Sequence, residues 1–176
     1  MKKLLILFLV LSIKLFPTAI TKYYNDWKVR NIAYDNSDNK TVTITMDKDK
    51  QLKIYMAFRS NQVSISITWY KDKIDENIPI IQYKLDNSKF YTIKPIMRSS
   101  SDNFDILYTI SPAFGIFQEK ELLNFLNALI GSKNLKIRPN DYGDYYDIDT
   151  SSLKDAIKNT DFTGTLFEKY KYDILK

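Results

Sequence analysis

The chain has 176 residues and a formal net charge of +5, with 26 lysines and arginines against 21 aspartates and glutamates. It contains no cysteine and no histidine, which excludes disulfides, thiol nucleophiles and ordinary zinc sites and removes the commonest general acid–base side chain. The length fits one domain that buries a substantial core.

Residues 1–19 have the pattern of a bacterial signal peptide. Lys2 and Lys3 precede an apolar run over residues 4–13, and Ala19 marks the predicted cleavage position. The run is shorter than the roughly 20 apolar residues of a membrane-spanning helix. We therefore predict a periplasmic or secreted bacterial protein with no stable membrane span after cleavage. An uncleaved membrane anchor and a buried N-terminal strand are the alternatives.

The first part of the mature chain is predicted to form an antiparallel sheet, because apolar and polar residues alternate along it. The clearest element is a hairpin, in which residues 52–58 and 63–69 alternate on either side of a short polar turn. Further strands are predicted over residues 28–34, 41–46, 80–85, 90–96 and 104–110, separated by polar turns and loops that include 36–40, 71–79, 86–89 and 98–103.

The period then changes to that of an amphipathic helix over residues 119–130, with Gly131 at the position expected for a C-terminal cap. Short strands over 134–138 and 145–148 and a short helix over 152–158 follow. These elements predict a single α+β domain over residues 20–160, dominated by an antiparallel sheet of meander or sandwich type. Residues 161–176 are predicted to be a C-terminal tail of undecided structure.

Two groups of residues match sequence patterns of catalytic or metal-binding motifs. Ser151 and Lys154 form a Ser-x-x-Lys pattern like that of serine acyltransferases, but Ser152 and Asp155 also have the spacing of a helix-capping box, which we favour. Four carboxylates lie close together in the sequence at Asp141, Asp144, Asp147 and Asp149. Calcium binding or paired-carboxylate glycoside hydrolysis would use such oxygens. Their spacing differs from that of an EF-hand, so we predict a solvated loop, with no catalytic residue, metal or cofactor.

The same segment is rich in tyrosine, which suits protein interfaces because the ring is apolar and the hydroxyl tolerates water. An AT-rich genome that raises tyrosine content overall is the alternative explanation. The predicted protein-contact surface consists of Asp141, Tyr142, Asp144, Tyr145 and Tyr146. The two tryptophans, Trp27 and Trp69, are predicted to be structural anchors of the sheet.

In the order of its elements, the chain resembles the VasI/TagO-like periplasmic proteins associated with type VI secretion. The resemblance covers residues 27–158. It begins at Trp27-Lys-Val, continues through Leu52-Lys-Ile-Tyr-Met56 and the strand ending at Trp69, and closes at Tyr146-Asp-Ile-Asp149. Met56 stands where that family usually carries a cysteine. The resemblance implies an accessory, non-enzymatic role in the envelope and transfers no catalytic residues. Exported β domains of the IalB type have a similar outline.

We therefore expect a virulence-associated accessory protein that binds an envelope or secretion-system protein. Signal cleavage would remove three lysines and leave a nearly neutral chain, which argues against a nucleic-acid partner. One alternative is an immunity protein that binds a secreted toxin. Another is a small envelope hydrolase, which would need a pocket that joins at least two of Asp141, Asp144, Ser151 and Lys154.

Overall fold

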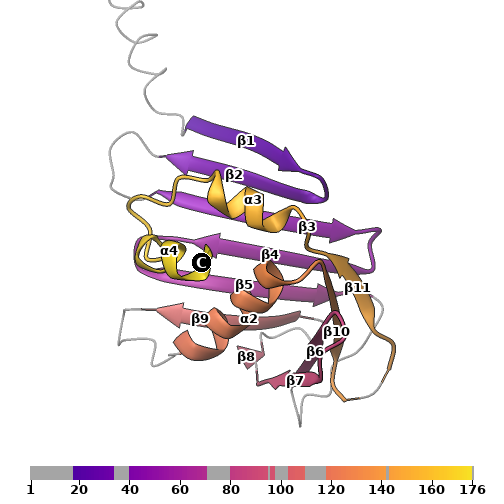
Figure 1. Cartoon of the computed structure of the whole chain (residues 1–176). Coiled ribbons are helices and arrows are strands. Elements are labelled where there is room, and N and C mark those ends of the chain that lie inside the picture. The colour runs from indigo at the N-terminus through magenta and orange to yellow at the C-terminus, as the bar shows by residue number, and fades with distance from the viewer. Residues whose placement is uncertain are drawn as a thin grey trace, which may run out of the picture.

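The computed structural model describes residues 18–33, 40–70, 80–94, 96–97, 103–109, 118–141 and 143–175. In these ranges the strands form two antiparallel sheets, and helices pack against one face of the larger sheet (Figure 1). The larger sheet has seven strands in the order β1-β2-β3-β4-β5-β9-β8, and the smaller has four in the order β11-β10-β6-β7. The predicted class, a single α+β domain dominated by antiparallel strands, is confirmed.

The larger sheet is a meander, because successive strands from β1 to β5 are neighbours. Its strands are β1 (Thr18–Tyr24), β2 (Trp27–Ala33), β3 (Thr41–Lys48), β4 (Leu52–Phe58), β5 (Gln62–Trp69), β8 (Ile96–Met97) and β9 (Asn103–Thr109). The predicted hairpin is β4–β5, with Leu52 opposite Trp69 and Phe58 opposite Val63. The alternation seen in the sequence therefore puts the large aliphatic side chains of these two strands, together with Phe58 and Trp69, on one face.

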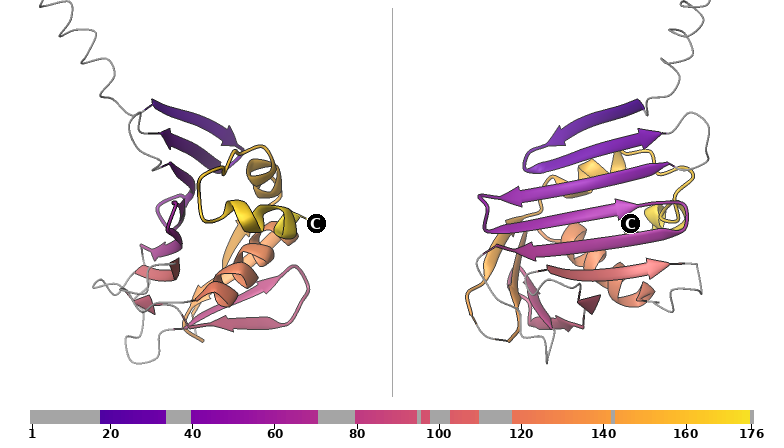
Figure 2. Two further views of the ribbon diagram at one scale, coloured as in Figure 1. Left: turned by 90° about the vertical axis from the view of Figure 1, so that its left-hand side faces the viewer. Right: turned by 180° about the vertical axis from the view of Figure 1, so that it is seen from behind.

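The helices lie on one side of the larger sheet, as the edge-on view shows (Figure 2), and the apolar face of the sheet packs with their buried residues in one core cluster. The fully buried side chains that it contributes include Trp27, Ile44, Leu52, Ile54, Met56, Phe58, Ile65, Ile67 and Trp69. The opposite face carries no helix in the described part of the chain (Figure 2). The core therefore lies between the larger sheet on one side and the helices with the smaller sheet on the other.

The smaller sheet joins segments that are far apart in the sequence. Its strands are β6 (Ile81–Leu85), β7 (Phe90–Ile93), β10 (Asn134–Pro139) and β11 (Tyr146–Asp149). The central strand β10 pairs with both β6 and β11. The single strand predicted over residues 90–96 is wrong, because β7 belongs to this sheet and β8 to the larger one. Pro95 in the connection lacks the N–H that would continue a strand ladder.

Three helices complete the described part: α2 (Glu119–Gly131), α3 (Leu153–Lys158) and α4 (Glu168–Leu175). The amphipathic helix predicted over 119–130 is α2, which buries Leu122, Phe125 and Leu126. The predicted cap at Gly131 is wrong. This residue lies within the helix, and Ser132 in extended conformation follows it. The Ser132 hydroxyl donates a hydrogen bond of 2.9 Å to the carbonyl oxygen of Ala128, so a side chain satisfies the helix end.

The C-terminal segment packs into the core. Phe162 and Phe167 are buried against Phe58, with ring centroids 5.0 Å and 4.8 Å from the Phe58 ring. The backbone N–H of Leu166 also donates to the carbonyl oxygen of Arg59 at 2.7 Å. The boundary predicted at residue 160 is therefore not a boundary of the hydrophobic core.

Most of the predicted signal peptide lies outside the described residues, which begin at Thr18. Ala19 lies within β1 and pairs with Ile32. Cleavage after Ala19 would thus leave the register from Ile20 to Tyr24 on β2 intact. Within the described ranges, no helix combines the length and apolar character required to cross a membrane.

Candidate functional site

The predicted contact residues lie in and beside the connection from β10 to β11. Asp141 and Asp144 are exposed there, and Tyr142 lies outside the described residues. Tyr146 starts β11 opposite the buried Ile137 and packs against the core. Tyr145 is half-buried. Because side chains alternate along a strand, Tyr145 and Tyr146 take opposite faces of the smaller sheet. The predicted surface is therefore divided, and Tyr145 belongs to the outward face.

On that outward face, four side chains form a continuous series of ring and cation contacts, which we call the aromatic–cation ladder. The guanidinium carbon of Arg138 lies 4.5 Å from the centroid of the Tyr145 ring. The Tyr145 ring stacks on Phe90, with centroids 5.2 Å apart and planes inclined by 16°. The ammonium of Lys84 lies 5.4 Å from the centroid of Phe90. Cations held over aromatic faces are attracted by the ring quadrupole.

The Arg138 side chain is fixed in place by further contacts. Its Nε and Nη2 donate to the Oε1 of Gln82 at 3.1 Å and 2.7 Å. Its Nη1 donates to the carbonyl oxygen of Gly143 at 3.3 Å. The guanidinium thus bridges β6, β10 and the connection to β11, and it orients the Tyr145 ring above the sheet.

The ladder is accessible to a partner. Phe90 is 50% exposed, which is high for a phenylalanine on a sheet. A neighbouring row of the same face holds an ion pair between the Nζ of Lys136 and the Oδ1 of Asp147 at 3.1 Å. This outward face therefore combines apolar rings with fixed charges of both signs.

The inward side of the smaller sheet also groups aromatic rings. Tyr83 stacks on Tyr91 with centroids 5.3 Å apart and contacts the edge of Phe125 at the same distance. Burial first, and then the neighbouring Tyr91, raise the pKa of Tyr83. Its phenol therefore remains protonated at neutral pH. A shallow depression of about 360 Å³ lies beside these two tyrosines and the α2 residues Asn124 and Asn127.

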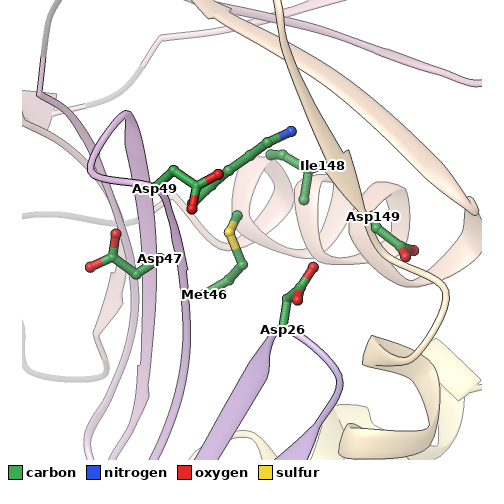
Figure 3. Close-up of a pocket in the computed structure, with 7 residues that line it drawn as sticks. Asp26, Met46, Asp47, Asp49, Ile148 and Asp149 are labelled. Carbon is green, nitrogen blue, oxygen red and sulfur yellow. The ribbon is translucent and has the colours of Figure 1, made fainter.

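A smaller pocket of about 190 Å³ lies between β3 and β11 (Figure 3). Lys48 lines it together with Asp26, Asp49 and Asp149 around Met46 and Ile148, whereas Asp47 points away from them (Figure 3). Hydrogen bonds from the side chain and then the backbone of Ser151 lower the pKa of Asp149. In the described ranges, no group of three or more acidic side chains is arranged to hold a metal ion.

The structure gives contacts or pocket positions for three of the four carboxylates of the predicted acidic segment. Asp147 pairs with Lys136, and Asp149 accepts a hydrogen bond of 2.9 Å from the backbone of Ser151. Asp144 and Asp147 both line a depression of about 390 Å³ with Lys48 and Gln51. Paired-carboxylate chemistry needs two such groups facing one substrate bond, and one of these two, Asp147, is engaged by Lys136.

The Ser-x-x-Lys residues lie at the start of α3. Lys154 lines a groove between α3 and α4, and Ser151 precedes α3 in a turn. Ser152 is the residue before the helix, as predicted, but the capping box is wrong because its hydroxyl makes no cap hydrogen bond. Its backbone has helical rather than extended dihedrals, and its hydroxyl donates to the carbonyl oxygen of Tyr24 at 2.9 Å. The serine ties α3 to the edge strand β1.

Both tryptophans are fully buried in the core. The indole Nε1 of Trp27 donates to the carbonyl oxygen of Asp149 at 3.1 Å, which links β2 to the end of β11. Their positions are those of structural anchors for the two sheets.

The sequence did not identify Phe90, Lys84 or Gln82 as site residues. Alternation predicts strands at 80–85 and 90–96 but not that β6 lies beside β10, whose paired residues Gln82 and Arg138 are 56 positions apart. The only sequence signal for this site was Phe90, an aromatic residue on the exposed face of a predicted strand.

Comparisons with protein-family models, with curated proteins and with solved structures found no match to this chain.

Proposed function

We propose that this chain is an exported, non-enzymatic protein that binds another protein of the bacterial envelope through the outward face of its smaller sheet. The observation that carries this proposal is the aromatic–cation ladder. Arginine and aromatic side chains dominate the binding energy of protein interfaces. Here the Arg138 guanidinium is already held by Gln82 and Gly143. Prior ordering lowers the entropy that association must overcome.

The location within the envelope is supported by the signal-peptide pattern of residues 1–19. The resemblance to VasI/TagO-like proteins supports an accessory role in a type VI secretion-like system. Cell fractionation and the secretion of marker proteins after gene deletion test these two statements separately. Finding the protein only in the cytosol would contradict the first, and unchanged secretion after deletion would contradict the second.

Site-specific photo-crosslinking in living cells tests the contact surface. A photoreactive amino acid at Thr92 would face outward beside Gln82 without replacing any ladder residue. The matched control carries the same amino acid at Tyr23, which is exposed on β1 of the other sheet. We expect one adduct of defined mass from position 92 and none from position 23.

A second variant connects the adduct to the ladder. Tyr145→Ala removes the middle of the ladder, and we expect it to abolish the adduct from position 92. Equal adducts from positions 92 and 23, or an adduct that survives Tyr145→Ala, would contradict the proposal. The identity of the crosslinked protein decides the biological role, because a secretion component supports the accessory role and a secreted toxin supports the immunity alternative.

A further inference from the structure

A second surface, which we call the lysine groove, lies between helices α3 and α4. It has a volume of about 630 Å³. The residues that line it are Lys154, Lys158, Lys171, Tyr172 and Leu175. Helices α3 and α4 belong to the helical layer of the fold (Figure 1), and the groove shares no lining residue with the aromatic–cation ladder.

Three lysines and no acidic residue line this groove. Lys154 and Lys158 are exposed and lie one helical turn apart on α3. Like charges at this spacing repel each other, so an anion bound between them would relieve the repulsion. Lys171 is held more rigidly, because its Nζ donates to the carbonyl oxygen of Thr160 at 2.6 Å and lies 5.6 Å from the centroid of Phe162.

Besides Lys171, the α4 side of the groove contributes two apolar surfaces. The Tyr172 side chain is 74% exposed, and Leu175 is half-buried with its inner part packed against the core. A ligand that matched both sides would place negative charge against α3 and an apolar group against α4. Volumes of this size are typical of binding clefts.

We propose that the lysine groove binds an acidic, amphipathic peptide segment of a partner protein. Its carboxylates would contact Lys154 and Lys158, and an apolar side chain would cover Tyr172 and Leu175. The lysines that line the groove favour a segment with an acidic side. The exposed ring of Tyr172 favours an apolar side on the same segment. An amphipathic segment in a groove between helices is an established mode of peptide recognition. This inference goes beyond the proposed function, because it concerns a different surface.

The inference can be tested by fluorescence anisotropy with the purified mature chain. The probe is a labelled amphipathic peptide in which glutamates alternate with leucines. We expect saturable binding that weakens with added salt. The double variant Lys154→Glu/Lys158→Glu should weaken binding by about tenfold or more, because it removes charge-assisted contacts. The matched control, Lys120→Glu/Lys133→Glu, changes the same charge at two other exposed lysines and should alter affinity less than about twofold.

The apolar half of the inference has its own test. Tyr172→Ala keeps every charge of the groove and should weaken the glutamate–leucine peptide severalfold. A peptide with serine in place of leucine should bind weakly and respond little to this substitution. Tyr172→Ala and the double variant Lys154→Glu/Lys158→Glu replace exposed side chains, so their thermal unfolding should match that of the parent chain.

Three outcomes would overturn the inference. The control pair could weaken binding as much as the groove pair, or the serine peptide could bind as well as the leucine peptide. Vesicles with phosphatidylglycerol could also bind at the groove while the peptide does not, which would identify a membrane surface. Tyr145→Ala should leave the peptide affinity unchanged, so failure of the ladder proposal and failure of the groove inference are distinguishable.

Discussion

The outward faces of the two sheets are built from different side chains. On the larger sheet, the outward rows of β3 and β5 consist mainly of small hydroxyl residues, namely Thr41, Thr43 and Thr45 on β3 and Ser64, Ser66 and Thr68 on β5. The smaller sheet instead presents the ladder of Arg138, Tyr145, Phe90 and Lys84. Threonine supports the strand conformation without exposing much apolar surface. An exposed stacked ring gives no comparable benefit to folding, which favours a binding role for the smaller sheet.

The inward faces of the two sheets, by contrast, serve one core. Tyr83 of the smaller sheet contacts Phe125 of α2, and α2 lies beside β9 of the larger sheet. Substitutions in this shared core should destabilise the whole domain. Substitutions on the two outward faces, by contrast, should have different effects in the two sheets.

The largest effect is expected from Phe58→Ala. Phe58 is fully buried and contacts both Phe162 and Phe167, so truncation leaves a cavity and should lower the free energy of unfolding by about 3–5 kcal/mol. Thr45→Ala on the outward face of the same sheet is the control, with an expected change within about 0.5 kcal/mol. Urea unfolding measures both, and a loss below about 1 kcal/mol for Phe58→Ala would contradict this account of the core.

The strands β2 to β5 of the larger sheet could be predicted from the sequence because their information is local, whereas the edge strand β1 was not predicted. Strict alternation on both sides of a short polar turn determined the β4–β5 hairpin and its register. The smaller sheet could not be predicted as a separate sheet. Its central strand β10 pairs with β6 across more than forty residues of intervening chain, and no periodicity records such a pairing. For the same reason β7 and β8 were merged into one predicted strand.

The site was predictable only in part. Tyrosine content directed attention to residues 141–146, and Tyr145 does lie on the ladder. Its partners Arg138 and Phe90 reach it through the long-range register of the smaller sheet. The C-terminal segment was missed because the burial of Phe162 and Phe167 depends on tertiary contact with Phe58.

A double-mutant cycle compares the two sheets directly. For Arg138→Ala and Tyr145→Ala we expect a coupling of about 0.5–1 kcal/mol in the free energy of unfolding, because Gln82 and Gly143 hold the guanidinium against the ring. The matched pair on the larger sheet is Lys28 and Tyr23, where the ammonium lies 5.9 Å from the ring centroid.

Tyr23 is 69% exposed, and the structure shows no comparable clamp on Lys28 within the described residues. We therefore expect a coupling near zero for that pair. Equal couplings in the two cycles, measured by urea unfolding at one salt concentration, would remove the distinction between a preorganised ladder and an ordinary surface contact.

The smallest effect concerns the ion pair between Lys40, which precedes β3, and Asp161 in the C-terminal segment. The hydrogen bond from Lys40, followed by those from Thr163, holds the pKa of the Asp161 carboxyl far below its usual range. A carboxyl with a lowered folded-state pKa stabilises the fold above its unfolded pKa of about 4, and this stabilisation is lost as the pH falls further. Asp161→Asn removes the charge but keeps an acceptor for the Thr163 N–H.

Because the Asp161 side chain is 65% exposed, solvent screens the pair, and we expect Asp161→Asn to lower the free energy of unfolding at pH 7 by only about 0.5 kcal/mol. The difference should shrink as the pH falls below about 4, because the unfolded chain then takes up a proton at this carboxylate while the folded chain keeps its charge, and 1 M salt at pH 7 should shrink it too. Asp141→Asn, which removes another exposed carboxylate, should show no such trend. A difference that grows on acidification would mean that the Lys40–Asp161 contact does not tie the C-terminal segment to the larger sheet.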